Sequence, residues 1–161
     1  MERTSSVLEI RSANVADSEA IAALLRESFA EFEPLYTPEG LAATTPPSQQ
    51  IRTRFEEGPV WVAVLGGVIV GTVSVAPQGE ALYIRSMAVH PSARGQGVAG
   101  RLLTMVERYA SAQGCKRLFL STTPFLTDAI RLYEHAGFTR VAEGPSHLFG
   151  TPLFTMEKWL A

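Results

Sequence analysis

Cysteine and positive charge are both scarce in this 161-residue sequence, and each scarcity argues against a class of protein. The single Cys115 excludes an internal disulfide framework, which fits a reducing compartment such as the cytoplasm. With 14 basic and 16 acidic residues the formal charge is −2, so nothing indicates nucleic acid or an anionic membrane as a partner. No Cys/His cluster has the spacing of metal ligands, so we expect no metal.

Apolar runs that target or anchor a chain are also missing. The opening residues, MERTSSVLEI, contain no run of the signal-peptide type. The uncharged stretch between Gly58 and Gly79 approaches the length that spans a bilayer. It is, however, crowded with β-branched residues and interrupted by Gly66–Gly67. We therefore predict a buried hairpin with strands at 60–65 and 68–75.

The length and composition fit one globular domain spanning residues 1–161, because 46% of the residues are hydrophobic and 19% are charged. The two hairpin strands lack apolar/polar alternation, which predicts helices on both of their faces. The expected fold class is thus α/β, a three-layer α-β-α sandwich with a mixed sheet.

The other expected elements follow from hydrophobic periodicity and from capping residues. Strands are expected at 6–13, 81–89 and 116–122, with two more around a Gly/Pro loop within 138–160. Helices are expected after the N-cap Asn14, within 48–58, over 97–113, and from a cap at Thr123-Pro124 to Gly137. The segment 33–47 holds four prolines and no clear period, so we expect a long loop there.

The stretch RGQGVAG, residues 94–100, contains the spacing Gly95-x-Gly97-x-x-Gly100 of a dinucleotide-binding loop. Its context does not support that interpretation. The residues HPSAR separate the preceding strand from Gly95, and no acidic residue ends the next strand to bind a ribose. Only 61 residues follow Gly100, too few for the remainder of a doubly wound domain.

A different phosphate-binding role is chemically sound for the same residues. A turn of small residues leading into a helix at Gly97 exposes backbone N–H groups, and the helix dipole adds positive potential that suits a pyrophosphate. Arg94 and Arg101 flank the turn and could meet phosphate charge. Taken alone, the pattern fits an ordinary glycine-rich helix entry with solvated arginines equally well.

Two longer segments carry a family resemblance. IRSMAVHPSARGQGVAGRLL followed by LFLSTTPFLTDAIRLYEHAGF resembles the Gcn5-related N-acetyltransferases (GNAT). The family's R/Q-x-x-G-x-G/A loop is matched by Arg94, Gly97 and Ala99, and its A-I-x-L-Y-x-x-x-G-F helix by Ala129 through Phe138. The resemblance implies a GNAT fold, whose central sheet is splayed, and acetyl-CoA as the co-substrate.

The resemblance also implies roles for named residues. The loop residues would hold the CoA pyrophosphate; they are Arg94, Gly95, Gln96, Gly97, Val98, Ala99 and Gly100. The backbone of Met87, Ala88 and Val89 would pair with the pantetheine arm, with the Val89 N–H polarising the thioester carbonyl. Tyr133 would protonate the departing thiolate. Without the resemblance, Met87, Val89 and Tyr133 would be interpreted as core residues.

The chain departs from the family pattern at two positions. Leu126 occupies the place of an asparagine that contacts pantetheine in many relatives, and Thr122 or Thr123 is a possible substitute. Tyr83 stands where several relatives carry a glutamate that acts as the general base. The base is therefore unassigned among a water chain and the side chains of Glu31, Glu33, Glu80 and His147.

The acceptor is the least defined part of the prediction. A partly apolar pocket is expected from Phe29, Phe32, Tyr36, Leu41 and Phe149, with Glu31 and Glu33 available to a cationic amine. The favoured function is acetyl transfer to a primary amine of a small molecule or peptide, by direct attack in a ternary complex. Two alternative functions remain: a non-catalytic module that senses acyl-CoA and, third, a nicotinamide-dependent oxidoreductase. Dimerisation is common among members of the family that the chain resembles, so a homodimer is possible.

Overall fold

A seven-stranded mixed sheet organises the computed structural model, which describes residues 7–161. Strands β4 and β5 are parallel and the other neighbours are antiparallel. In spatial order the strands are β1 (Leu8–Ser12), β2 (Val60–Leu65), β3 (Val68–Gln78), β4 (Ala81–Val89), β5 (Arg117–Thr122), β9 (Phe154–Trp159) and β6 (Thr139–Val141). A separate small ladder pairs β7 (His147–Leu148) with β8 (Thr151–Pro152).

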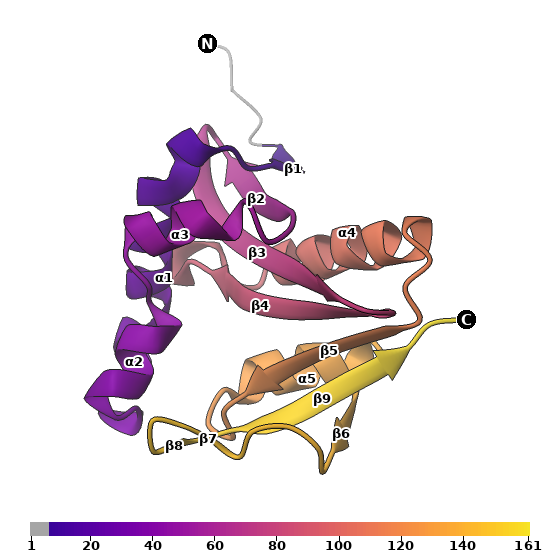
Figure 1. Cartoon of the computed structure of the whole chain (residues 1–161). Helices are drawn as coiled ribbons and strands as arrows, with labels where there is room; N and C mark the ends of the chain where they lie inside the picture. Colours follow the sequence, from indigo (N-terminus) through magenta and orange to yellow (C-terminus); the bar gives the residue numbers. More distant parts are fainter. Residues whose placement is uncertain (1–6) are drawn as a thin grey trace.

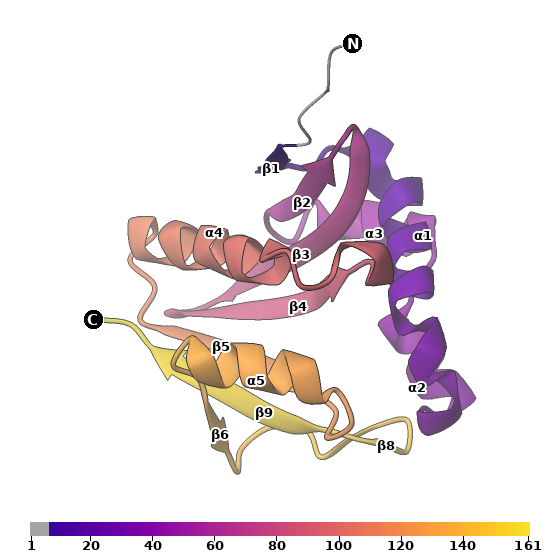
Figure 2. The ribbon, with the colours of Figure 1, turned by 180° about the vertical axis from the view of Figure 1, so that it is seen from behind.

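Helices cover both faces of the β2–β4 half of the sheet, which confirms the predicted α/β sandwich (Figures 1 and 2). The first face carries α1 (Ser18–Phe29), preceded by the 3-10 turn η1 (Val15–Asp17), and α3 (Ser48–Arg54). On the opposite face lie α4 (Val98–Ala112), which follows the short turn η3 (Pro91–Ala93), and α5 (Thr127–His135). Within the described chain, no helix has the length and apolar character needed to cross a membrane.

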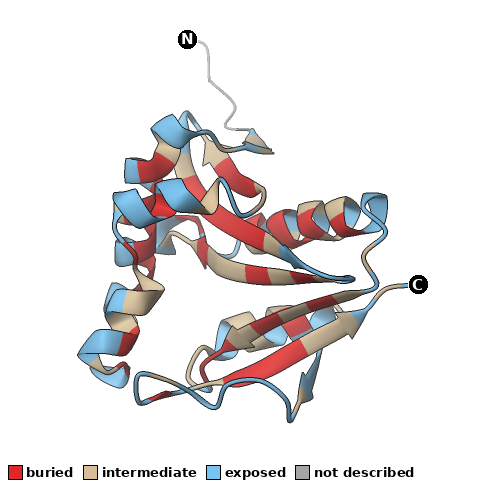
Figure 3. Cartoon of the chain, viewed as in Figure 1, coloured by how far each residue is buried: buried red, intermediate tan, exposed pale blue. Residues whose placement is uncertain are grey.

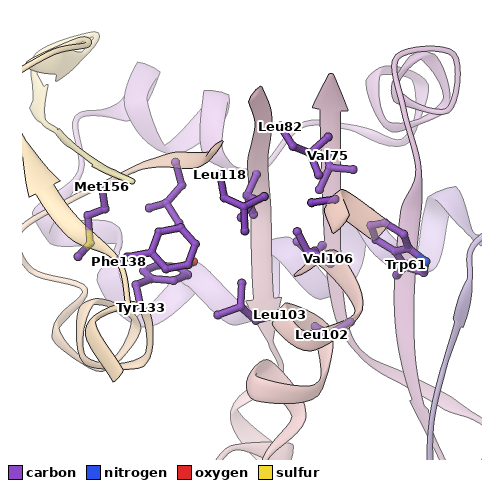
Figure 4. Packing of buried hydrophobic residues seen from close by; sticks show 14 of the residues in the cluster. Trp61, Val75, Leu82, Leu102, Leu103, Val106, Leu118, Tyr133, Phe138 and Met156 are labelled. Carbon is purple, nitrogen blue, oxygen red and sulfur yellow. The ribbon is translucent and has the colours of Figure 1, made fainter. Parts of the chain in front are cut away.

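Two hydrophobic clusters, one on each face, hold the layers together, and the red bands in Figure 3 mark their buried residues. On the α4/α5 face, Val75, Leu82, Leu102 and Val106 pack behind the centre of the sheet (Figure 4). On the α1/α3 face, Ile21, Leu25 and Ile51 pack against Val60, Val62 and Ala88. The continuous apolar run of β2 is explained by this double burial, since Trp61 and Ala63 face one cluster while Val60 and Val62 face the other.

Several predicted boundaries are confirmed. Gly66 and Gly67, with φ of 58° and 80°, form the tight β2–β3 turn, and Gly114, with φ of 75°, follows the end of α4. Asn14 caps η1 through its side chain, which accepts a hydrogen bond from the Ala16 N–H at 3.0 Å.

Two local predictions are wrong. The segment 33–47 is not a loop, because it contains the end of η2 (Ala30–Leu35) and the helix α2 (Pro38–Thr44). Thr37 caps α2 by accepting from the Gly40 N–H at 3.0 Å, and Pro38 occupies its first turn. Thr123-Pro124 does not cap the later helix either, since α5 begins at Thr127 after Leu126.

Candidate active site

Strands β4 and β5 separate partway along their length, and this opening is the centre of the candidate site (Figure 1). The parallel pairing joins only Ala81–Tyr83 to Arg117–Phe119. From Ile84 to Val89, β4 therefore has no strand partner on its β5 side, and its polar backbone groups there are free to bind a ligand. The predicted residues Met87, Ala88 and Val89 all lie in this unpaired stretch.

A β-bulge marks the start of the opening. Thr72 of β3 faces Ala88, and Ser74 faces Arg85, so Ser86 and Met87 together oppose one residue of β3. Ser86 has a φ of 56°, a left-handed conformation that is uncommon for a residue other than glycine. Strained backbone of this kind is concentrated at functional sites.

The glycine loop lies just beyond β4 and leads into α4. Gly95 and Gly97 have φ of 80° and 77°, and Gly97 is the N-cap of α4 with no side-chain cap on the first-turn N–H groups. A Cβ added at Gly95, Gly97 or Gly100 would meet no atom within 4 Å. The glycines thus leave open space in front of uncapped N–H groups, which suits a phosphate at a helix N-terminus.

Both arginines near the loop are engaged elsewhere. Arg94 forms an ion pair with Glu31, and its Nη2 donates to the Ser28 carbonyl at 3.0 Å. The Nη1 of Arg101 donates to the Leu8 carbonyl at 2.7 Å. The backbone of the loop, more than these guanidinium groups, is therefore placed to bind an anion.

A cleft of about 230 Å³ lies between α4 and α5, and Gly100 in the first turn of α4 is part of its lining. It is lined by Gly100, Leu103, Thr104 and Glu107 of α4 and by Leu132, His135 and Ala136 at the end of α5. Sequence reasoning assigned no role to Leu132 or His135. Leu132 and His135 are three residues apart on α5 and therefore share one helix face, whereas Tyr133 lies on a different face, toward the core.

Tyr133 is 5% exposed and lies between α5 and the sheet. Its ring packs at 5.7 Å, centroid to centroid, from Phe138, near Leu118 and Met156 (Figure 4). Burial raises the pKa of the Tyr133 phenol well above its usual range. The side chain is protonated at neutral pH, so its hydroxyl has a proton or a hydrogen bond to donate there.

The aromatic residues expected around the acceptor are partly brought together. Phe29 and Tyr36 meet edge to face at 6.4 Å, and Tyr36 meets Phe125 at 4.9 Å, while Phe32 lies 6.1 Å from Phe125. Phe125 was not predicted for this pocket, although it directly follows the Thr123-Pro124 turn. Leu41 packs against the same cluster, whereas Phe149 is 64% exposed.

The candidate bases and substitute hydroxyls are dispersed. Glu31 is paired with Arg94, and Glu80 lies before the first residue of β4, at the end away from the bulge, beside Lys116. Glu33 lies on the surface of η2, and His147 is exposed on β7. Tyr83 stacks on Phe119 at 5.1 Å. The side chains of Thr122 and Thr123, the possible substitutes for the family's asparagine, are buried. Tyr36 lies close to Thr123: burial raises the pKa of the Tyr36 phenol, and hydrogen bonds with the hydroxyls of Thr44 and Thr123 oppose that rise.

No group of three His, Cys, Asp or Glu side chains in residues 7–161 is arranged to hold a metal ion.

Comparison with known proteins adds an independent line of evidence. Residues 21–138 match the sequence model of the Acetyltransferase (GNAT) family. The N-acetyltransferase YjgM of Escherichia coli is 31% identical over 138 residues, which are 82% of each chain. Other relatives are matched over less of their length; the mouse probable N-acetyltransferase family 8 member 5 is 35% identical over 92 residues, 40% of that protein.

Solved structures share the fold at low sequence identity. The PaiA N-acetyltransferase of Thermoplasma acidophilum, in complex with coenzyme A, superposes with a TM-score of 0.82 at 16% identity, over 96% of this chain and 99% of that one. YncA of Salmonella typhimurium, with its cofactor acetyl-CoA, gives a TM-score of 0.74 at 24% identity, over 96% of this chain and 94% of that one.

Proposed function

Because this chain belongs to the Acetyltransferase (GNAT) family, we propose that it transfers the acetyl group of acetyl-CoA to a primary amine by direct attack in a ternary complex. The observation that carries the proposal is the convergence of three features on one region. They are the unpaired stretch of β4, the uncapped glycine loop that follows it, and the cleft between α4 and α5, the helix that carries Tyr133.

The glycine loop holds the pyrophosphate in this proposal. The first-turn N–H groups of α4 donate to its oxygens, and the open space in front of Gly95, Gly97 and Gly100 lets the phosphates approach the backbone closely. The groove along Gly100, Leu103 and Leu132 takes the pantetheine arm toward β4. These residues thus fit acetyl-CoA without a contribution from the Arg94 guanidinium.

The unpaired backbone of β4 orients the thioester. The N–H of Val89 donates to the carbonyl oxygen, where negative charge develops as the amine attacks. Tyr133, which is neutral at physiological pH, donates its proton or a hydrogen bond to the departing sulfur. The nitrogen gains the acetyl group and loses one proton, and the sulfur gains one.

An acyl-CoA-sensing module is the second candidate. The observation that favours it is the side chain at position 83, where a stacked tyrosine stands instead of a carboxylate that could accept the amine proton. Under that alternative, acetyl-CoA binds and amines do not promote release of free CoA.

Amine-dependent release of CoA thiol, measured with acetyl-CoA and a panel of primary amines, tests the proposal. Tyr133→Phe is expected to lower kcat about ten- to a hundredfold while leaving the affinity for acetyl-CoA within about twofold. Tyr109→Phe is the matched control. Tyr109 lies in the part of α4 away from the glycine loop, and its ring packs against Trp61 with 5.5 Å between centroids. Equal turnover by wild type and Tyr133→Phe would remove Tyr133 from the mechanism, and the absence of turnover with every amine would favour the sensing module.

Three further features remain proposals. The acceptor is a small molecule or a peptide, the location is cytoplasmic on the basis of the single cysteine, and the chain forms a homodimer. Size-exclusion chromatography with light scattering tests the last of these.

A further inference from the structure

Two arginines meet at the β4 bulge, on the face of the sheet that carries α1 and α3. Arg54 is the last residue of α3, and its Nη1 donates a hydrogen bond to the hydroxyl of Ser86. Arg85, the neighbour of Ser86, forms an ion pair with Glu57. The Nε of Arg85 is buried and has no hydrogen-bond partner in residues 7–161.

The charges of this group do not balance. The two guanidinium groups of Arg54 and Arg85 face a single carboxylate, that of Glu57, whose side chain is 50% exposed. In the described part of the chain Arg54 takes part in no ion pair, and its only side-chain partner is the Ser86 hydroxyl. Burial, and then the charge of Arg85, lowers the pKa of Arg54. A half-buried cation whose only hydrogen-bond partner is a neutral hydroxyl, and which shares its nearest carboxylate with a second arginine, is costly unless an anion completes it.

The group is placed where an acceptor must arrive. Acetyl-CoA lies on the α4/α5 face in the proposed function, so the attacking amine reaches the thioester through the opening from the other face. Ser86 precedes Met87, the first of the residues assigned to the pantetheine, and the left-handed backbone at Ser86 belongs to the bulge from which the opening begins. An acceptor at the opening therefore lies beside both arginines.

We infer that the acceptor carries a carboxylate, which Arg54 and Arg85 bind while the amine of the same molecule is acetylated. This inference rests on the proposed function and narrows its substrate class to amino acids. One unit of positive charge is left after Glu57 is counted, and a carboxylate supplies one negative charge. Guanidinium groups bind carboxylates through paired hydrogen bonds, and the Nη groups of Arg54 and Arg85 that are not engaged by Ser86 or Glu57 provide the donors.

The test compares amino acids with their own primary amides as acceptors in the CoA-release assay. Suitable pairs are glycine, methionine, phenylalanine and 4-aminobutyrate with their amides. The amine of an amide is less basic and more of it is unprotonated, so intrinsic reactivity favours the amide. For at least one pair, wild-type protein is expected to use the acid with a kcat/KM about ten- to a hundredfold above that of the amide.

Charge-removing variants then locate the preference. Arg54→Met and Arg85→Met are expected to remove it by lowering kcat/KM for the acid alone, and Arg54→Lys to retain part of it. Arg117→Met is the matched control, since Arg117 lies on the same sheet face but stacks on Phe119 and pairs with Glu157. Calorimetric binding of acetyl-CoA to every variant shows that the fold and the cofactor site persist.

The outcomes separate the two claims. If acetyl-CoA does not bind, or no amine is acetylated, the proposed function fails and the inference falls with it. If neutral amines are acetylated and no acid exceeds its amide, the proposed function stands and the carboxylate inference is overturned. A preference for acids that survives both Arg54→Met and Arg85→Met would likewise overturn the assignment of these two residues.

Discussion

The carboxylate of Glu31, in η2, forms an ion pair with the guanidinium of Arg94, which lies 63 residues later in the glycine loop. The same guanidinium reaches the Ser28 carbonyl in α1. Nearby, the Nε2 atom of His90 lies 2.8 Å from the Oε1 atom of Glu27. The segment that carries the aromatic acceptor residues is thus tied directly to the end of β4 and to the loop that holds phosphate in our proposal.

Glu31→Gln is expected to tighten acetyl-CoA binding about two- to fivefold at low salt, because it frees Arg94 and removes a negative charge near the phosphates. The gain should fade in high salt. Glu33→Gln is the control, since Glu33 lies in the same turn and forms no ion pair in residues 7–161. Weaker binding by Glu31→Gln would show instead that the ion pair positions the loop.

Gly100→Ala is expected to change stability and binding in opposite directions. Gly100 lies inside α4, and a methyl group there meets no atom within 4 Å, so alanine should raise the free energy of unfolding by about 0.5–1 kcal/mol. The same methyl group enters the space assigned to the pyrophosphate and should weaken acetyl-CoA binding. Urea denaturation and calorimetry measure the two effects, with Ser111→Ala as a control in the last turns of α4. Unchanged binding would place the phosphates elsewhere.

The buried phenol of Tyr133 predicts a dependence of stability on alkaline pH. The unfolded chain begins to release this proton near pH ~10, whereas the folded protein retains it because burial raises the pKa of Tyr133. The free energy of unfolding should therefore fall above pH ~10, by up to about 1.4 kcal/mol per pH unit for this group. Tyr133→Phe should show a shallower decline than wild type. Parallel declines would mean that the phenol ionises as readily in the folded protein as in the unfolded chain.

Thr37→Val is expected to loosen the contact between α2 and the β7–β8 ladder. The Thr37 hydroxyl donates to the Phe149 carbonyl at 2.8 Å, and the Thr37 N–H donates to the Thr151 hydroxyl at 2.9 Å. Valine keeps the backbone N–H bond to Thr151 but loses the N-cap and the hydroxyl bond to Phe149, which should cost about 1 kcal/mol of stability. The KM for the acceptor should rise while acetyl-CoA affinity is kept. Thr45→Val, which loses only a bond within the end of α2, serves as the control.

Much of the fold was predictable because its signals are local. The Gly66–Gly67 turn and the apolar face of α4 each depend on a few neighbouring residues, and both predictions are confirmed. The helix α2 was missed because its stability depends on distant contacts. A Cβ at Gly40 would lie 2.3 Å from the Thr151 hydroxyl, so this short helix packs against a ladder far along the chain that periodicity cannot reveal.

The candidate site divides in the same way. The glycine loop and Tyr133 lie in continuous motifs, so the sequence alone could nominate them. The hydrogen bond between Arg54 and Ser86 joins residues 32 positions apart. It depends on the β4 bulge, which no local sequence pattern predicts. Phe125 likewise meets Tyr36 and Phe32 across about 90 positions of the chain, because the turn after β5 packs against η2.

Calorimetric titration of the purified protein with acetyl-CoA, with NADH as the comparison ligand, tests the central claim most directly. The glycine loop and the α4/α5 cleft predict saturable binding of one acetyl-CoA per chain, lost in Gly97→Trp, and no binding of NADH. Binding of NADH without binding of acetyl-CoA would contradict the account, and Gly95-x-Gly97-x-x-Gly100 would then be a dinucleotide loop after all.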